Sequence, residues 1–280
     1  MGSRIRSLVW IGAVVVACDV QERPPRLPAN SAGSAVLSEP PDSAIPAGAL
    51  GAAIRRGRAL LADTPDSLPD HVGSDLRCFS CHLGEGTQAG ALPLIGVYSR
   101  FPQYRSRNAL VNLLEDRIND CFERSLNGKA LPRTGREMRE IMAYFGFISR
   151  GVAPPGEVPG MGLDSVRAET PDTVRGAAVF SATCTRCHGP GGLGLGGLGP
   201  PLWGPRSFNV GAGMARLWTA AAFIRHNMPN DRAVTLTDQQ AADVAAYVVS
   251  RPRPDFAGKG RDWPNGNAPP DVPYLTRGAP

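Results

Sequence analysis

Aromatic side chains are scarce in this chain. Phe, Trp and Tyr make up 6% of the 280 residues, and hydrophobic residues of all kinds make up 42%. The length allows two domains of ordinary size. So few large apolar side chains predict only a modest protein core in each of them.

The chain is also short of long apolar runs and of runs of basic residues. The apolar run at residues 8–17 falls below the roughly 20 residues that a membrane-spanning helix needs. The net charge is +5, but the 30 Lys and Arg residues are dispersed, so we expect no nucleic-acid partner. A small anionic substrate or an anionic membrane surface explains the charge as well.

Cysteine is sparse too, with 6 residues, but four of them belong to two copies of one pattern. Residues 78–82 read CFSCH and residues 184–188 read CTRCH, and C-x-x-C-H is the attachment site of a c-type haem. Zinc ligands or a redox C-x-x-C are the alternatives, although neither needs a His directly after the second Cys. The pattern predicts two covalently bound haem c groups, attached at Cys78, Cys81, Cys184 and Cys187, with His82 and His188 as iron ligands. Each haem would be the largest apolar object in its domain.

The amino-terminal residues resemble a bacterial export signal. Arg4 and Arg6 precede the apolar run, which ends in VVAC at Cys18 and resembles a lipobox, where the signal is removed and the Cys is lipidated. An ordinary signal peptide with an incidental Cys is the alternative. Because c-type haem is attached outside the cytoplasm, we expect a periplasmic protein, with Cys18 as a candidate lipid anchor. Cys18 and Cys121 lie in different contexts, so no disulfide is expected.

The segments around the two motifs follow the same order. Gly57 and Gly176 each lie in a predicted helix ahead of the motif, where a Gly suits close crossing by another helix. Pro93 and Pro200 follow the motif histidines by 11 and 12 residues (93 − 82 and 200 − 188). We expect a carbonyl in each of these loops to accept the ring N–H of the preceding His.

Each half is also predicted to end in a capped helix. Thr134 with Glu137, and Thr237 with Gln240, have the spacing of a capping box. The repeated order predicts an all-α protein with two cytochrome c-like domains in tandem, each wrapped around one haem. The predicted divisions are an export signal over 1–17, a flexible tether over 18–50, domain 1 over 51–150, a linker over 151–172, domain 2 over 173–252 and a Pro-rich tail over 253–280.

The second axial ligand is predicted to differ between the two haems. Met228 lies 40 residues after His188 (228 − 188), at the end of a predicted helix, and a Met there is the usual distal ligand. Met214 and His226 are the alternatives in that half. In the first half Cys121 lies 39 residues after its motif His (121 − 82), so the spacing predicts a cysteine sulfur on that iron. The alternative is a buried, inert Cys.

Charged and hydroxyl side chains surround Cys121 in the sequence. On a helix, Arg117 and Ser125 lie four residues to either side of it, on the same face. Arg107 and Lys129 bracket the stretch. Such groups suit the binding of a sulfur-containing oxyanion. The alternative is that they form ion pairs with neighbouring acidic side chains on a solvated helix face, and for Arg124 we prefer this alternative.

Three segments resemble one known family. FPQYRSR (101–107), LEDRINDCFERSLNGKALP (114–132) and the tail RPRPDF…RDWP…APPDVPY are similar to the di-haem thiosulfate dehydrogenases of bacteria. That resemblance implies oxidation of two thiosulfates to tetrathionate, a reaction that can also run in reverse, with electrons passed from haem 1 to haem 2 and on to an acceptor cytochrome or similar redox partner. It implies a His82/Cys121-ligated active-site haem, with Arg107, Arg117 and Ser125 as active-site residues and Met228 on the second iron.

One position departs from the family pattern. Some members carry a Lys just before the distal Met and exchange the two ligands with redox state. Asn227 stands there in this chain, so we expect Met228 to bind in both states. Two other functions remain open: an electron-transfer cytochrome without its own substrate, and a related cytochrome that oxidises other sulfur compounds.

Overall fold

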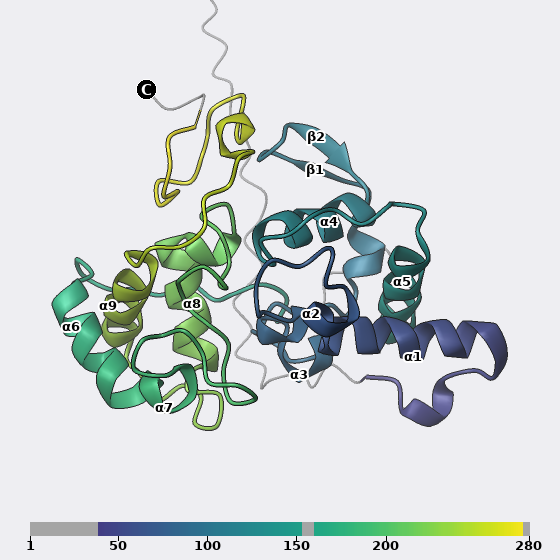
Figure 1. Cartoon of the computed structure of the whole chain (residues 1–280), viewed down its shortest axis with the longest axis horizontal. Coiled ribbons are helices and arrows are strands. Elements are labelled where there is room, and N and C mark those ends of the chain that lie inside the picture. The colour runs from purple at the N-terminus through teal and green to yellow at the C-terminus, as the bar shows by residue number, and fades with distance from the viewer. Residues whose placement is uncertain (1–38, 153–159, 277–280) are drawn as a thin grey trace, which may run out of the picture. The chain divides into compact units, whose positions relative to one another are not determined.

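The computed structural model describes residues 39–152 and 160–276, all within one unit of the chain, residues 34–280. The predicted export signal, Cys18 and most of the tether lie outside the described residues. The helices gather in two groups, α1–α5 and α6–α9 (Figure 1). No helix within the described ranges is both long and apolar enough to cross a membrane.

The elements of the first group are α1 (Gly48–Ala62), α2 (Thr64–Ser67), α3 (Leu83–Gly86), β1 (Gln103–Arg105), β2 (Leu110–Asn112), α4 (Leu114–Arg124) and α5 (Arg136–Ile148). Those of the second group are α6 (Thr173–Val179), α7 (Thr185–His188), α8 (Leu217–Asn227) and α9 (Asp238–Val249), with a π-helical segment, Phe180–Cys184, joining α6 to α7.

The predicted close helix crossings are confirmed in both halves. A Cβ atom on Gly57 of α1 would lie 2.0 Å from the carbonyl oxygen of Glu140 in α5. A Cβ atom on Gly176 of α6 would lie 2.0 Å from the carbonyl oxygen of Asp243 in α9. Because only glycine permits such an approach, each half is built on the same tight pair of its first and last helices.

The structure adds one short helix and tests both predicted capping boxes. Pro65 falls in the first turn of α2, where its missing N–H costs little. The capping box at Thr237 is confirmed, with Gln240 N–H donating to the Thr237 hydroxyl at 3.2 Å. The capping box predicted at Thr134 is wrong. Helix α5 begins one residue later than that box requires, with Gly135 as its N-cap and no side-chain cap.

Helix α4 is the predicted helix around Cys121. Leu114, Ile118 and Phe122 recur every four residues and are buried, so one face of α4 packs into the core of the first half. Cys121 precedes Phe122 and is half-buried, at the edge of that apolar face.

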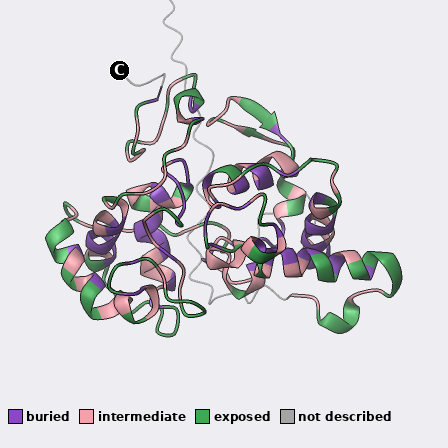
Figure 2. Ribbon diagram, in the orientation of Figure 1, coloured by how far each residue is buried: buried purple, intermediate pink, exposed green. Residues whose placement is uncertain are grey.

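A short antiparallel hairpin was not predicted. β1 pairs with β2, with Tyr104 opposite Val111 and Arg105 opposite Leu110. Three residues per strand are too few to show an alternating pattern in sequence. Much of the hairpin is exposed (Figure 2). It is the one sheet among the described residues, so the predicted all-α class is confirmed apart from these two short strands.

The carboxyl-terminal tail packs against the first half. Asp262 is 2% exposed and accepts two hydrogen bonds from Arg124 of α4, both 2.8 Å long, and one from the Tyr274 hydroxyl at 2.6 Å. The prediction that Arg124 lies on a solvated face is therefore wrong, although Arg124 does form an ion pair on its own helix, with Asp120 at 3.7 Å. The tail thus braces the helix that carries Cys121.

Candidate functional site: two sulfur-lined cavities

One cavity, which we call the cysteine cavity, brings the first motif together with Cys121. Cys78, Cys81 and His82 line it from one segment, and Cys121 lines it from α4. The cavity has a volume of about 250 Å³, and many of the other lining side chains are apolar. His82 and Cys121, which are far apart in sequence, therefore line the same cavity.

The ring of His82 is oriented by the loop that follows it. Its Nδ1 atom lies 2.5 Å from the carbonyl oxygen of Leu92, to which it donates. Leu92 has a φ of 54°, in the left-handed region, just before Pro93. Burial lowers the pKa of His82 to about 4, so the ring is neutral and its Nε2 lone pair is available to a metal.

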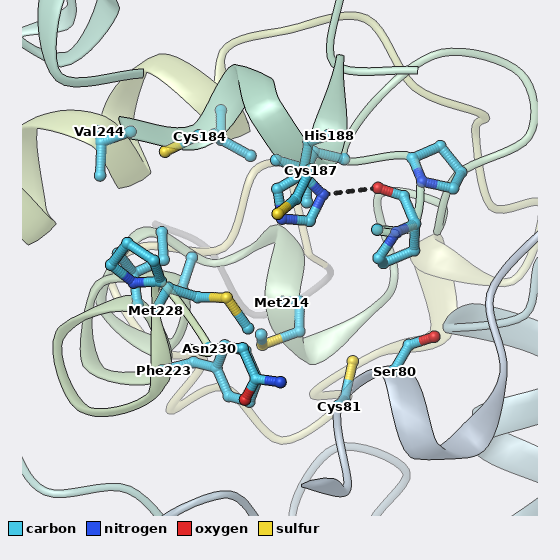
Figure 3. Close-up of a pocket in the computed structure, with 18 of the residues that line it drawn as sticks. Ser80, Cys81, Cys184, Cys187, His188, Met214, Phe223, Met228, Asn230 and Val244 are labelled. Atoms are coloured by element: carbon cyan, nitrogen blue, oxygen red, sulfur yellow. Dashed lines mark hydrogen bonds between the residues drawn. The ribbon is translucent and has the colours of Figure 1, made fainter. Parts of the chain in front are cut away.

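The second cavity, which we call the methionine cavity, is built from the second motif and Met228 (Figure 3). Its volume is about 220 Å³. Nδ1 of His188 donates to the carbonyl oxygen of Pro200 at 2.8 Å, and burial lowers the pKa of His188. Of the two alternative ligands, Met214 lines this cavity, whereas His226 is not among its lining residues.

Both cavities have the chemistry that a c-type haem requires. Each presents two thiols, a neutral imidazole with one free nitrogen, and a sulfur atom from a distant segment, within largely apolar walls. A carbonyl fixes the tautomer of each imidazole, as is usual for metal-binding histidines. The donor set therefore fits haem c in both cavities.

The cysteine cavity is strongly cationic. Nη1 of Arg117 donates to Sγ of Cys121 at 2.8 Å, and the pKa of Arg117 is raised, above all by that sulfur. Ser125 also lines the cavity, so the structure brings three of the four predicted active-site residues together. The arginines that line it are Arg77, Arg100, Arg105 and Arg117, and no Asp or Glu is among its described lining residues.

The fourth predicted residue, Arg107, is not among the residues that line this cavity. Its Nη1 donates to the carbonyl oxygen of Gly211 at 2.6 Å and lies 4.0 Å from the Asp262 carboxylate. Its guanidinium also lies 4.6 Å from the ring centre of Trp263. Arg107 thus contacts the second half and the tail.

Sequence reasoning missed Arg100 and Arg105 as cavity residues. Both occur in or beside the FPQYRSR segment, but nothing there signals that the strand ends at Arg105. In a continued strand, residues 105 and 107 would share a face. A turn follows β1 instead, so the two side chains separate.

Asn227 connects the two halves next to the predicted distal Met. Its side chain is 1% exposed, accepts a hydrogen bond from Gln88 at 3.1 Å and donates to the carbonyl oxygen of Gly90 at 2.9 Å. Both partners belong to the loop that orients His82. The cavities also adjoin, since Leu76 and Cys81 line both of them.

The fold and the paired cavities define a class of protein. Residues 72–153 match the family model described as "SoxA/TsdA, cytochrome c domain", and residues 171–248 match "Cytochrome C oxidase, cbb3-type, subunit III". The chain consists of two cytochrome c domains, a fold that carries covalently bound haem c.

Relatives define the family within that class. The chain is 44% identical to the thiosulfate dehydrogenase of Allochromatium vinosum, covering 88% of this chain and 92% of that protein. It is 41% identical to that of Psychrobacter arcticus, covering 87% and 76%. The solved "Thiosulfate dehydrogenase (TsdBA)" of Marichromatium purpuratum superposes with a TM-score of 0.74 at 35% identity, covering 79% of this chain and half of that longer one. The chain therefore belongs to the thiosulfate dehydrogenases, a family of oxidoreductases that act on a sulfur donor.

Proposed function

We propose that this protein joins two thiosulfate ions into tetrathionate and passes the two released electrons to an external acceptor. One sulfur–sulfur bond forms, and no proton is exchanged. Run in reverse, the same reaction reduces tetrathionate. The observation that carries the proposal is Cys121: its sulfur accepts a hydrogen bond from Arg117 within a cavity that the first haem motif also lines.

The proposed cofactors are two haem c groups. Cys78 and Cys81 would attach the first, with His82 and Cys121 as axial ligands. Cys184 and Cys187 would attach the second, with His188 and Met228 as its ligands. When bound, haem supplies a one-electron acceptor, so two of them match the two electrons of the reaction.

The proposed work of the polypeptide is to assemble two like-charged substrates. Two thiosulfate dianions repel each other, so cationic side chains must offset that repulsion before their sulfur atoms can meet. Arg117 is held on the face of α4 beside Cys121, and Ser125 offers a hydroxyl one turn later. Burial strengthens these contacts because it removes competing water.

The difference between the ligands supports a direction for electron flow. A cysteine sulfur brings negative charge to iron and a Met thioether does not, so we expect a lower potential at the cysteine cavity. Leu76 and Cys81 line both cavities, which supports a short path for electrons from the cysteine cavity to the methionine cavity. The external acceptor would be a cytochrome or similar redox partner, in the periplasm, with Cys18 as the proposed lipid anchor.

An optical titration of the purified holoprotein tests the proposal. With thiosulfate as reductant and ferricyanide as terminal acceptor, we expect haem reduction, turnover and one tetrathionate per two thiosulfates consumed. Haems that a partner cytochrome reduces but thiosulfate does not would contradict it and would indicate an electron carrier without its own substrate.

A further inference from the structure

We propose that Arg105 is a substrate-binding residue of the cysteine cavity, where it contacts the anion together with Arg117. The inference rests on the proposed function and adds to it a residue that the sequence comparison did not single out. Arg107, which the family resemblance placed in this role, would then act by positioning.

The position of Arg105 carries the first part of the argument. It is the last residue of β1 and pairs with Leu110 of β2, so its backbone is fixed by the hairpin. It lines the cysteine cavity together with Arg100, Arg117 and Cys121. A guanidinium held on a rigid element is well suited to orient a bound oxyanion.

The charge balance carries the second part. Among the described residues, the guanidinium of Arg105 makes no hydrogen bond and no ion pair with an acidic side chain, and the same holds for Arg100. The neighbouring carboxylate of Asp120 is paired with Arg124 instead, at 3.7 Å. Burial, and then the charge of Arg117, lower the pKa of Arg105. An anion in the cavity would relieve this repulsion between cations.

Arg107 differs in both respects. Its guanidinium already has a carbonyl partner in Gly211 and a carboxylate neighbour in Asp262. The backbone N–H of Trp263 also donates to the carbonyl oxygen of Arg107 at 2.6 Å. These contacts hold the tail to the turn after β1, so they support the hairpin that carries Arg105.

Binding of tetrathionate to the fully oxidised holoenzyme tests the inference without turnover, because ferric haems hold no electrons with which to reduce the ligand. The variants are Arg105→Gln, Arg105→Lys and, as a matched loss of charge on the exposed surface of α5, Arg139→Gln. Loss of a charge-assisted contact should raise the Kd of Arg105→Gln roughly 10- to 100-fold in isothermal titration calorimetry. Arg105→Lys should recover part of the affinity, and Arg139→Gln should bind like the wild type.

A redox titration of the same proteins separates the alternatives. If Arg105 instead neutralises a carboxylate of the haem, Arg105→Gln would bind tetrathionate like the wild type but would change the haem potential, and the inference would be overturned. An Arg105→Gln variant that has both the wild-type Kd for tetrathionate and unchanged haem potentials would overturn the inference as well. If wild-type protein forms no tetrathionate from thiosulfate, it is the proposed function that fails, so the two failures are distinguishable.

Discussion

The two cavities share a scaffold but differ in charge. Each is built on a glycine-mediated helix crossing, a C-x-x-C-H motif and a loop carbonyl that orients the motif histidine. Four arginines line the cysteine cavity, whereas the described lining of the methionine cavity contains no Arg, Lys, Asp or Glu. The repeated parts fit a haem in each cavity, and the four arginines that line one cavity alone suit an anionic substrate.

Replacing Cys121 by Gly should have the largest effect on activity. We expect thiosulfate oxidation to fall by roughly 10³-fold or more, as when a group at the reacting centre is removed. Steady-state rates with ferricyanide measure it, and the spectrum of the Met-ligated haem should be unchanged.

The matched change in the other cavity is Met228→Leu. It removes the proposed distal ligand, a thioether of the kind that raises a haem potential, so we expect that potential to drop and electron transfer to the acceptor to slow. The Kd for tetrathionate should stay at the wild-type value. A Cys121→Gly enzyme that turns over normally, or a Met228→Leu enzyme that loses tetrathionate binding, would break the distinction between the cavities.

Removing the buried contact between Asp262 and Arg124, which braces α4, should cost more stability than removing an exposed ion pair of the same tail. Asp262 and Arg124 are nearly buried, and Asp262→Ala leaves the Arg124 guanidinium with only its longer ion pair to Asp120 at 3.7 Å, so the change should destabilise the protein by about 3 kcal/mol. Urea unfolding followed by circular dichroism measures the change. Asp255→Ala, which breaks an exposed pair with Lys259 in the same tail, should cost at most about 1 kcal/mol. Equal losses of unfolding free energy in the two variants would show that the buried Asp262–Arg124 pair does not brace α4.

Arg117→Gln should weaken the reaction while leaving Cys121, the proposed iron ligand, in place. Loss of one preorganised charged donor typically lowers kcat by about 10²-fold. We expect kcat/KM for thiosulfate to fall by that order while the haem content stays the same. A value within twofold of the wild type would exclude Arg117 from the site.

The smallest predicted effect is that of Ser125→Ala. A neutral hydrogen bond contributes about 0.5–1.5 kcal/mol, so kcat/KM should fall by roughly 2- to 10-fold. Ser250→Ala is a hydroxyl control, because Ser250 is exposed, lies outside both cavities and donates to the carbonyl oxygen of Tyr247. Equal losses in both variants would show that the effect of Ser125 is not specific to the cysteine cavity.

Much of the fold could be predicted because its signals are local in sequence. The haem motifs, the helix around Cys121 and the glycines at the crossings each lie within a few residues of the feature that they specify. The all-α class and the order of elements followed from their repetition. A capping box is local too, yet Thr134 failed because Gly135 supplied an equally good start for α5.

The site was harder to predict because its contacts are distant in sequence. Arg124 and Asp262 are 138 residues apart, and neither segment shows that the other will cover it. The turn after β1 decides which of Arg105 and Arg107 lines the cavity. Two arginines two residues apart carry no signal of that turn, so the choice between them needed the structure.

The electron paramagnetic resonance spectrum of the ferric holoenzyme tests the central claim most directly. We predict two distinct low-spin haem signals, of which Cys121→Gly removes one and leaves the other unchanged. A Cys121→Gly spectrum identical to that of the wild type would show that this sulfur is not on the iron, and the account of the cysteine cavity as a catalytic centre would be contradicted.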